Sequence, residues 1–199
     1  MKNANIFKVL PNHLSPRPGR LLISEPLLSD VYFQRSVVLL VEHSADSGSI
    51  GFILNKKTIL TMRDVVPEFE KLPEISIYFG GPVAANRLFF IHSLGDLIVP
   101  NTLKINDNLY FDGDFEALKS YILSGFDITG KVKFFMGYSG WENHQLSKEI
   151  QSHSWVVGHS DDEHVLSGNG DAYWKSSVIN LGGDYKRLWK YYPKETYLN

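Results

Sequence analysis

Residues 36–55 read SVVLLVEHSADSGSIGFILN, two apolar runs joined by a short polar segment. The first run, residues 36–42, is continuous and rich in β-branched and leucine side chains, which is typical of a strand covered on both faces and therefore central in its sheet. Residues 43–49 are mostly small and polar, as is typical of a turn, and residues 50–55 resume a strand pattern. The stretch therefore predicts an antiparallel hairpin near the centre of a β-sheet.

Shorter patterns of secondary structure surround this hairpin. Strand patterns occur at residues 20–24, 75–79, 87–92 and 131–137, with weaker candidates at 96–99 and 108–111. Residues 114–125 follow a helical period and end at Gly125, a typical helix stop. The pairs Thr61–Asp64 and Ser139–Glu142 have the spacing of capping boxes that open helices, and a further helix is expected over residues 172–181.

The order of these patterns predicts a single α+β domain. Strands dominate the first half and helices enter late without strict alternation, which favours a mixed or antiparallel sheet over a doubly wound fold. Three prolines make residues 1–18 an irregular arm, so we expect the domain to span residues 19–199. A chain of 199 residues suffices for one well-buried domain.

Composition narrows the classes of function. The hydrophobic content of 43% and the charged content of 21% are ordinary for a soluble protein, and the net charge of −2 provides no general attraction for nucleic acid. The absence of cysteine excludes disulfides, thiolate nucleophiles and cysteine-ligated zinc. No segment is long and apolar enough to span a membrane, and NIFKVL (5–10) is too short for a signal-peptide core, so we expect a cytoplasmic protein.

Glu42 and His43 place a carboxylate beside an imidazole, a pair that general acid–base chemistry uses. Neighbours in a regular strand point to opposite faces, so these two side chains share a site only if the strand contains a bulge. The hairpin pairs residue 42 with about residue 51 and places Asn55 opposite about Val38, roughly 13 Å from Glu42 along the strands. A structural pair at a strand end is therefore favoured over a catalytic Glu–His–Asn group.

Two other clusters have the residue types of a binding site. His153, His159, Asp161, Asp162 and His164 are metal-ligand types, but their spacing matches no metal motif, so a solvated loop is favoured over a metal site. The stretch YKRLWKYYPK (185–194) interleaves cations with aromatic rings. Such a stretch can grip single-stranded nucleic acid, or its aromatic side chains can dock the chain end onto the core.

The stretch FGGPV (79–83) follows a strand with two glycines and a proline. We expect it to connect the strand at 75–79 to the strand at 87–92, with positive φ at Gly80 and the exit direction fixed by Pro82. Free N–H groups at such a turn can also hold an anion. The stretch lacks the lysine of a phosphate-binding loop and the spacing of a dinucleotide fingerprint, so no cofactor is expected.

Three blocks in order resemble one family. They are GRLLISEPLLSDVYFQRSVVLLVEHSADSGSIGFILNK (19–56), YFGGPVAANRLFFIHSL (78–94) and GYSGWENHQLSKEI (137–150), the last with SW shortly after it. Together they look like the YqgE/AlgH family of bacterial proteins, and their sequences most resemble those of members from the Bacteroidetes. The resemblance runs from about Gly19 to the C-terminus.

The resemblance implies a single α+β domain built on a coiled, bifurcated mixed β-sheet with flanking helices. Some members carry the label of transcriptional regulator, and no established enzyme activity, cofactor or DNA-binding element comes with the family. The signature positions, which come without assigned roles, are Glu42, His43, Asn55, Gly80, Gly81, Pro82, His92, Gly140, Trp141, Gln145 and Leu146.

The chain departs from the family pattern at two positions. Lys57 replaces a proline, and His144 replaces the glycine of Trp-x-x-Gly-Gln-Leu. A side chain at position 144 argues against close approach of a ligand to the backbone there. Because histidine is a better helix former than glycine, the change is not expected to damage a helix.

These observations favour a non-enzymatic regulatory protein that acts through contacts with an unknown protein partner. The alternative is a small-molecule-binding protein or enzyme with a pocket near Gly80–Pro82, lined by His92, Trp141 and Gln145. Sequence-specific DNA binding is not expected, because six arginines spread along the chain make no phosphate-tracking surface. The oligomeric state is left open.

Overall fold

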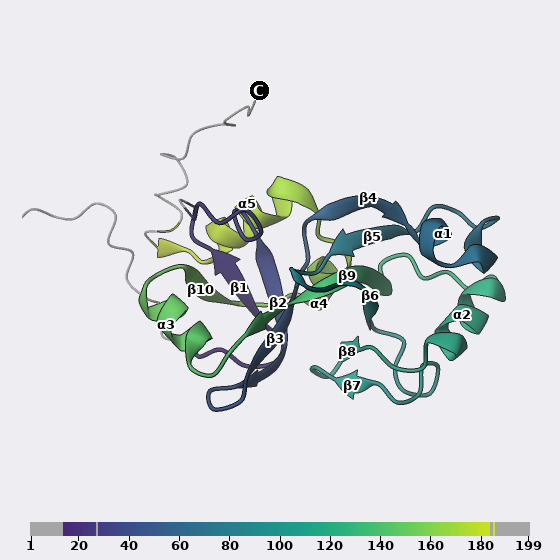
Figure 1. Cartoon of the computed structure of the whole chain (residues 1–199), viewed down its shortest axis with the longest axis horizontal. Coiled ribbons are helices and arrows are strands. Elements are labelled where there is room, and N and C mark those ends of the chain that lie inside the picture. The colour runs from purple at the N-terminus through teal and green to yellow at the C-terminus, as the bar shows by residue number, and fades with distance from the viewer. Residues whose placement is uncertain (1–13, 27, 184, 186–199) are drawn as a thin grey trace, which may run out of the picture.

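The computed structural model describes residues 14–26, 28–183 and 185 (Figure 1). In chain order the strands are β1 (Arg20–Ser24), β2 (Val37–Ser44), β3 (Gly48–Ile53), β4 (Lys57–Thr61), β5 (Ser76–Phe79), β6 (Val83–His92), β7 (Leu103–Lys104), β8 (Tyr110–Phe111), β9 (Val132–Trp141) and β10 (Trp155–His159). The helices are α1 (Met62–Val65), α2 (Phe115–Leu123), α3 (Gln145–Gln151), α4 (Asp162–Ser167) and α5 (Gly170–Asn180), with a 3-10 turn at Pro67–Phe69. The strands form one mixed sheet in the order β10-β1-β2-β3-β9-β6-β8-β7, and β4 joins it through β5. The predicted α+β class is confirmed.

The predicted central hairpin is formed by β2 and β3. Leu39 pairs with Phe52, and β2 also pairs with β1, so the strand is interior over its first half. Its side chains enter two cores in alternation, with Leu39 on one face and Leu40 on the other. The register shifts between Leu40 and Glu42, which makes Val41 the additional residue of a β-bulge. Glu42 consequently pairs with Ile50, one residue from the predicted partner.

The sheet divides at β9. One edge of β9 pairs with β6. Its other edge pairs with the parallel strand β5 over Phe134–Met136 and with β3 over Ser139–Trp141. The backbone of β3 also bonds the residue that follows β5, because Ile53 N donates to Gly80 O. β5 therefore lies in a fork between β3 and β9, and this fork is the bifurcation that the family resemblance implies.

The stretch FGGPV (79–83) crosses β9 at this fork, because it connects two strands on opposite edges of β9. The prediction of positive φ at Gly80 is wrong, and the positive value, 152°, belongs to Gly81. A β-carbon at Gly80 would collide with the carbonyl oxygen of Gly137, and one at Gly81 would collide with the backbone of Tyr138. The double glycine is explained by two backbones in close approach.

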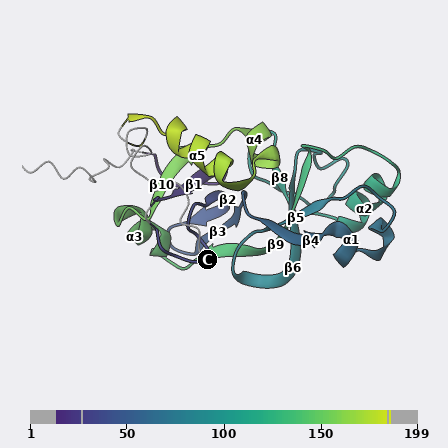
Figure 2. The same ribbon diagram turned by 90° about the horizontal axis from the view of Figure 1, so that it is seen from above.

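Helices cover the sheet in three places, which Figures 1 and 2 show from two sides. α5 lies over one face of the strands β1 and β2, where Trp174 is buried in the same cluster as Leu39, and α4 packs against β9. α3 lies on the opposite face, with Leu146 packed in the cluster of the β2 side chain Leu40. α1 and α2 close the far lobe around Phe134. In the described part of the chain, no helix is long and apolar enough to cross a membrane.

Several predicted elements are confirmed. Residues 115–123 and 170–180 are helices, and the Asp64 carboxylate accepts hydrogen bonds from Thr61 N at 2.7 Å and Thr61 Oγ1 at 2.8 Å. The Ser139–Glu142 capping box is wrong, because β9 continues to Trp141 and α3 begins only at Gln145. Residues 96–99 form turns rather than a strand, and α4 occupies part of the predicted polar loop.

Candidate functional site

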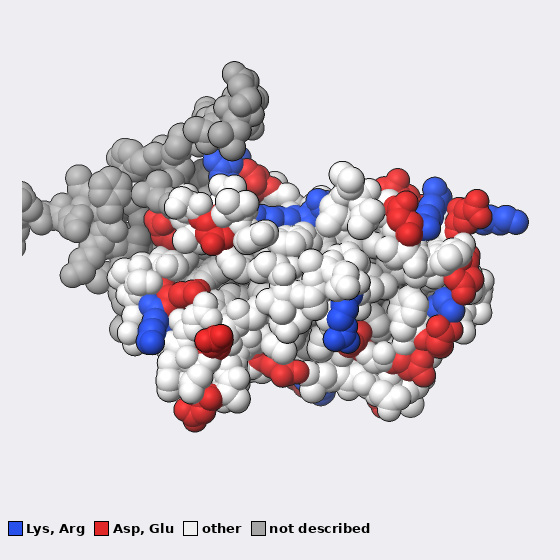
Figure 3. All heavy atoms as spheres, viewed as in Figure 1, with Lys and Arg blue, Asp and Glu red and all other residues white. Residues whose placement is uncertain are grey.

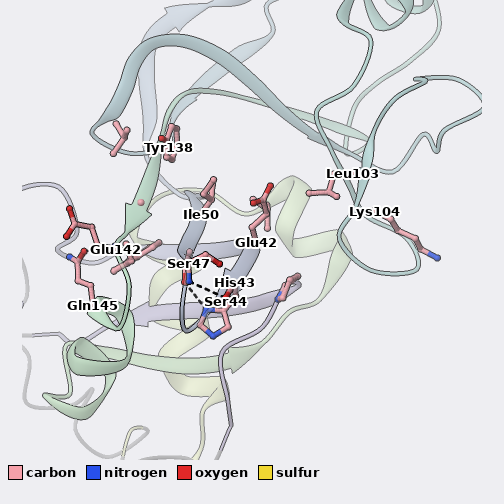
Figure 4. Close-up of a pocket in the computed structure, with 17 residues that line it drawn as sticks. Glu42, His43, Ser44, Ser47, Ile50, Leu103, Lys104, Tyr138, Glu142 and Gln145 are labelled. Carbon is pink, nitrogen blue, oxygen red and sulfur yellow. Dashed lines mark hydrogen bonds between the residues drawn. The ribbon is translucent and has the colours of Figure 1, made fainter.

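An open groove with a volume of about 860 Å³ lies where the free ends of β2, β3 and β9 face the β7–β8 hairpin (Figure 4). The sequence-predicted residues that line it are Glu42, His43, Gly140, Trp141 and Gln145. Residues that the sequence reasoning did not single out complete the lining, chief among them Ser49, Ile50, Val83, Leu103, Lys104, Tyr138 and Glu142. The groove is thus built from segments that are distant in the sequence.

Glu42 and His43 both line the groove, although they are neighbours on one strand. The bulge at Val41 immediately precedes them and breaks the regular alternation of side chains. His43 Nδ1 lies 2.7 Å from the hydroxyl of Ser49, its partner across the hairpin. Burial lowers the pKa of His43 from its ordinary value, so its imidazole is held neutral near pH 7. Glu42 is exposed and has no ion pair with any residue that the structure describes.

A carboxylate behind the groove fixes the wall that α3 provides. Glu149 Oε2 accepts hydrogen bonds from two indoles, Trp141 Nε1 at 2.9 Å and Trp155 Nε1 at 2.8 Å. Its other oxygen accepts from Gln145 Nε2 at 2.8 Å, and Gln145 Oε1 in turn accepts from Glu142 N at 2.9 Å. Trp141 and Gln145 are therefore held in place by Glu149, a residue without a motif in the sequence that would have identified it.

The opposite wall is the β7–β8 hairpin. Leu103 is 43% exposed and faces the groove, and Val83 at the start of β6 is 39% exposed. Lys104 is a groove cation, but its Nζ lies 3.1 Å from Asp107 Oδ1 in the same hairpin. Much of its charge is therefore balanced locally.

A second, smaller cleft adjoins the groove across Leu103 and shares Glu42 with it. Its lining includes Asp112 and Asp114. Burial raises the pKa of Asp112 to about 6, although the Arg87 guanidinium acts in the opposite direction. Asp114 caps α2, because its Oδ1 accepts from Ala117 N at 3.1 Å. This part of the surface is therefore rich in carboxylates.

The other signature residues lie away from the groove and have structural contacts. Asn55 is 3% exposed, and its side chain accepts from Val37 N at 2.9 Å and donates to Arg35 O at 2.9 Å. His92 is fully buried, with Nε2 3.2 Å from Asp112 O, and burial lowers its pKa. Both side chains satisfy backbone groups that would otherwise be buried without partners.

Gly80, Gly81 and Pro82 form the crossing of β9 and do not line the groove, which begins at the next residue, Val83. Of the residues that the sequence suggested for a pocket near Gly80–Pro82, Trp141 and Gln145 line the groove, and His92 does not. The turn itself contributes only through the position of Val83.

The histidines that have metal-ligand chemistry, for which the sequence favours a solvated loop over a metal site, are dispersed. His153 follows α3 with φ 64°, and His159 Nδ1 lies 2.7 Å from an Arg20 nitrogen. His164 Nδ1 lies 3.1 Å from Asp161 Oδ2, at the start of α4. The described part of the chain contains no group of three or more His, Asp or Glu side chains that could hold a metal ion. Most of the aromatic and basic C-terminal stretch, residues 186–194, lies outside the described residues.

His144 precedes α3 rather than lying in it, and it has a left-handed backbone with φ 56°. Glycine adopts this conformation without strain, so the family glycine suits the position better than histidine. Helix propensity therefore does not apply at this residue, because it precedes the first residue of α3. His144 N donates to Ala45 O at 3.1 Å, which ties the α3 wall to the β2–β3 loop.

Lys133 is a buried cation that the sequence reasoning missed. It is 3% exposed, and its Nζ donates to Gly168 O at 2.5 Å, beyond the C-terminal end of α4. The ammonium also lies 4.2 Å from the centroid of the Tyr78 ring. Burial lowers its pKa to about 7. The signal in the sequence was its position between Val132 and Phe134, inside a strand covered on both faces.

We expect Lys133 to make stability depend on pH. Between its folded pKa of about 7 and its ordinary value of 10.5, the unfolded chain binds a proton that the folded chain has released. The free energy of unfolding therefore rises with pH in this window, by at most about 1.4 kcal/mol per pH unit. Urea denaturation at pH 7 and pH 9 should show the free energy of unfolding of the wild type rise by about 2 kcal/mol relative to that of Lys133→Met. A constant difference would mean that Lys133 stays protonated in the fold.

Comparison with known proteins places these features in a family. A family model described as AlgH-like matches residues 21–186. A UPF0301 protein of Parabacteroides distasonis is 60% identical, with 98% of each chain covered, and one of Bacteroides fragilis is 42% identical, with 99% of this chain and 98% of the relative covered.

Two solved structures share the architecture. The solution structure of the AlgH protein from Pseudomonas aeruginosa has a TM-score of 0.68 and 26% identity, and covers 89% of this chain and 96% of that one. A crystal structure from Corynebacterium diphtheriae has a TM-score of 0.73 and 22% identity, covers 91% of this chain and 94% of that one, and supports the fold alone. With a family match over most of its length and close relatives in the Bacteroidetes, the chain belongs to the AlgH-like family.

Proposed function

We propose that this chain is a non-enzymatic regulatory protein of the cytoplasm, and that it acts by binding another polypeptide in the groove between β2 and β7. The observation that carries the proposal is the shape of the groove and its exposed apolar side chains. Sites for small molecules are concave and bury most of the ligand. This groove is open, and it presents Val83 and Leu103, which are 39% and 43% exposed. An open apolar surface of this kind suits a polypeptide segment.

Some members of the family are labelled transcriptional regulators, and in this proposal any effect on transcription is indirect. On the face in Figure 3, basic and acidic side chains are interspersed, and the basic ones form no continuous patch. The groove itself carries Glu42 and Glu142, which repel phosphates. Regulation through a protein partner is therefore favoured over direct contact with DNA.

A second candidate is an enzyme or a small-molecule-binding protein that uses the same groove. The observation in its favour is the 2.7 Å contact between His43 Nδ1 and Ser49 Oγ, with a neutral imidazole able to accept the hydroxyl proton. Among the described residues, no carboxylate bonds His43 to orient it, and Ser49 is only 6% exposed. Labelling of Ser49 by a serine-directed fluorophosphonate probe, lost in Ser49→Ala, would favour this candidate.

Affinity capture with matched surface variants tests the proposal. Leu103→Asp places a charge in the groove, whereas Leu97→Asp makes the same change at a fully exposed leucine outside it, with an exposed fraction of 101%. We expect the wild type and Leu97→Asp to retain the same partner protein from native cells, and Leu103→Asp to lose it by tenfold or more. The interaction should then be reproduced with the purified partner.

Two results would contradict the proposal. One is a partner retained equally by all three proteins, which would place the contact outside the groove. The other is micromolar or tighter binding to duplex DNA near physiological salt with a steep salt dependence, which would make the chain a DNA-binding protein.

A further inference from the structure

We propose that the groove binds an extended cationic peptide, which adds as a strand between the free half of β2 and the edge strand β7. This inference rests on the proposed function and specifies the chemistry of the partner. It follows from three features of the groove: its unpaired strand edges, its unbalanced carboxylates, and the apolar side chains on its surface.

Two strand edges border the groove without a strand partner among the described residues. β1 pairs with β2 only over Val37–Leu39, and the last bond on that side joins Gly19 N to Leu40 O at 2.8 Å. β2 continues to Ser44, and Val41 through Ser44 line the groove. β7 is the last strand of the sheet and pairs only with β8. Unpaired backbone groups at such edges can bond an added strand, the mode by which several peptide-binding domains recognise extended ligands.

The charges in the groove favour a cationic ligand. Glu42 and Glu142 line it and make no ion pair within the part of the chain that the structure describes. Among the described residues, the lysine that lines the groove is Lys104, which is paired with Asp107, and burial favours the neutral form of His43. Asp112 and Asp114 extend the acidic surface into the adjoining cleft. A basic side chain in the groove would therefore meet carboxylates that lack partners.

The apolar residues favour a ligand with alternating side chains. Ile50 and Tyr138 rise from β3 and β9 between the two carboxylates, and Leu103 faces them from the opposite wall (Figure 4). Successive side chains of a strand point to opposite sides. An extended peptide that alternates apolar and basic residues can thus bury its apolar side chains against this surface and direct its cations to the rim.

Peptide binding measured by titration calorimetry tests the inference on the full chain. The probes are three capped hexapeptides: RVRLRV, its acidic counterpart EVELEV, and RVRLRV with N-methyl groups on alternate peptide nitrogens, which removes backbone donors. Spermine serves as a cation without a peptide backbone. We expect saturable binding of RVRLRV only, weakened at higher salt.

Matched protein variants locate the site. The double variant Glu42→Gln/Glu142→Gln should lower the affinity for RVRLRV about fivefold, because each exposed charge pair contributes modestly to binding. Asp46→Asn, at the exposed tip of the same hairpin and outside the groove lining, should change the affinity by less than about twofold. Chemical-shift changes should concentrate at the backbone amides of residues 41–44 on β2 and 103–104 on β7.

Several outcomes would overturn the inference: equal binding of EVELEV or spermine, retained affinity of the N-methylated peptide, no effect of the double variant, or no saturable binding up to about 1 mM. The proposed function fails separately, when the captured partner is indifferent to Leu103→Asp. A partner that depends on the groove, combined with failure of the cationic peptide, would leave the function standing and remove this inference.

Discussion

Gly80→Ala is expected to lower the free energy of unfolding by about 3 kcal/mol or more, because its new β-carbon has no space in the fork of the sheet. The nearest atoms are the carbonyl oxygen of Gly137 and, at 2.8 Å, Cδ1 of the buried Phe52. The first is backbone of β9, which is bonded on both edges and cannot move without breaking the sheet. The loss arises from steric collision, since φ at Gly80 is not positive.

A pair of glycines with almost the same backbone angle separates collision from conformational strain. Gly137 has φ 68° and would place a β-carbon against Gly81 O and, at 2.9 Å, Val83 O. Gly130 has φ 67° and nothing within 4 Å of the added carbon. Gly130→Ala should therefore lower the free energy of unfolding by only about 1–2 kcal/mol, the strain of a left-handed alanine. Gly137→Ala should lower it by at least twice as much.

Urea denaturation monitored by circular dichroism gives these values. Equal losses for Gly137→Ala and Gly130→Ala would show that the two backbones at the fork are not in close contact. Added phosphate or nucleotide should not restore the stability of Gly80→Ala, because packing explains why glycines occupy these positions. Recovery on addition of either would instead indicate an anion site at the crossing of β9.

Glu149→Ala should have the second large effect, a loss of about 2–4 kcal/mol, because two buried indole N–H groups lose their common acceptor. Trp141 and Trp155 are 5% and 3% exposed, so water cannot replace the carboxylate without opening the packing. Glu149→Gln keeps one oxygen for the indoles but brings its amide N–H₂ against the N–H₂ of Gln145. It should therefore lose less, about 1–2 kcal/mol.

Tryptophan fluorescence and near-ultraviolet circular dichroism during urea unfolding measure both the stability and the indole environment. Ser152→Ala, at the residue that follows α3, is a suitable control, because its exposed hydroxyl accepts no hydrogen bond from an indole. A loss for Glu149→Ala no greater than that of Ser152→Ala would show that the indoles find other acceptors. Loss of the carboxylate should also weaken the binding of any ligand in the groove, because Gln145 and Trp141 form one wall of the groove.

Local patterns were sufficient for several parts of this protein. The continuous apolar run at residues 36–42 predicted a strand covered on both faces, and β2 is central. The helical period at 114–125 predicted α2, and the Thr61–Asp64 spacing predicted the start of α1. The three sequence blocks identified the family. In each case the information lies within a few residues, where hydrophobic periodicity and capping operate.

Elements whose identity depends on distant partners were predicted poorly. Ser139 lies in β9 because β3 and β6 bond this strand on both sides, although its spacing to Glu142 resembles a helix cap. Asn55 and His92 are polar signature residues that suggested a site, but each satisfies backbone groups brought to it by folding. Glu149 and Lys133 had no motif, since their partners lie on other elements or beyond a turn.

The α+β class, the central hairpin and the main helices could be predicted from the periodicity of neighbouring residues, and three blocks of sequence identified the family. Only the tertiary structure decided that the glycines at 80 and 81 serve a fork in the sheet, and that residues 42–43, 103–104 and 138–145 meet in one groove. The physical reason is that backbone approach and groove shape depend on which strands become neighbours. That choice is made by the packing of the whole core, and no local window of sequence contains it.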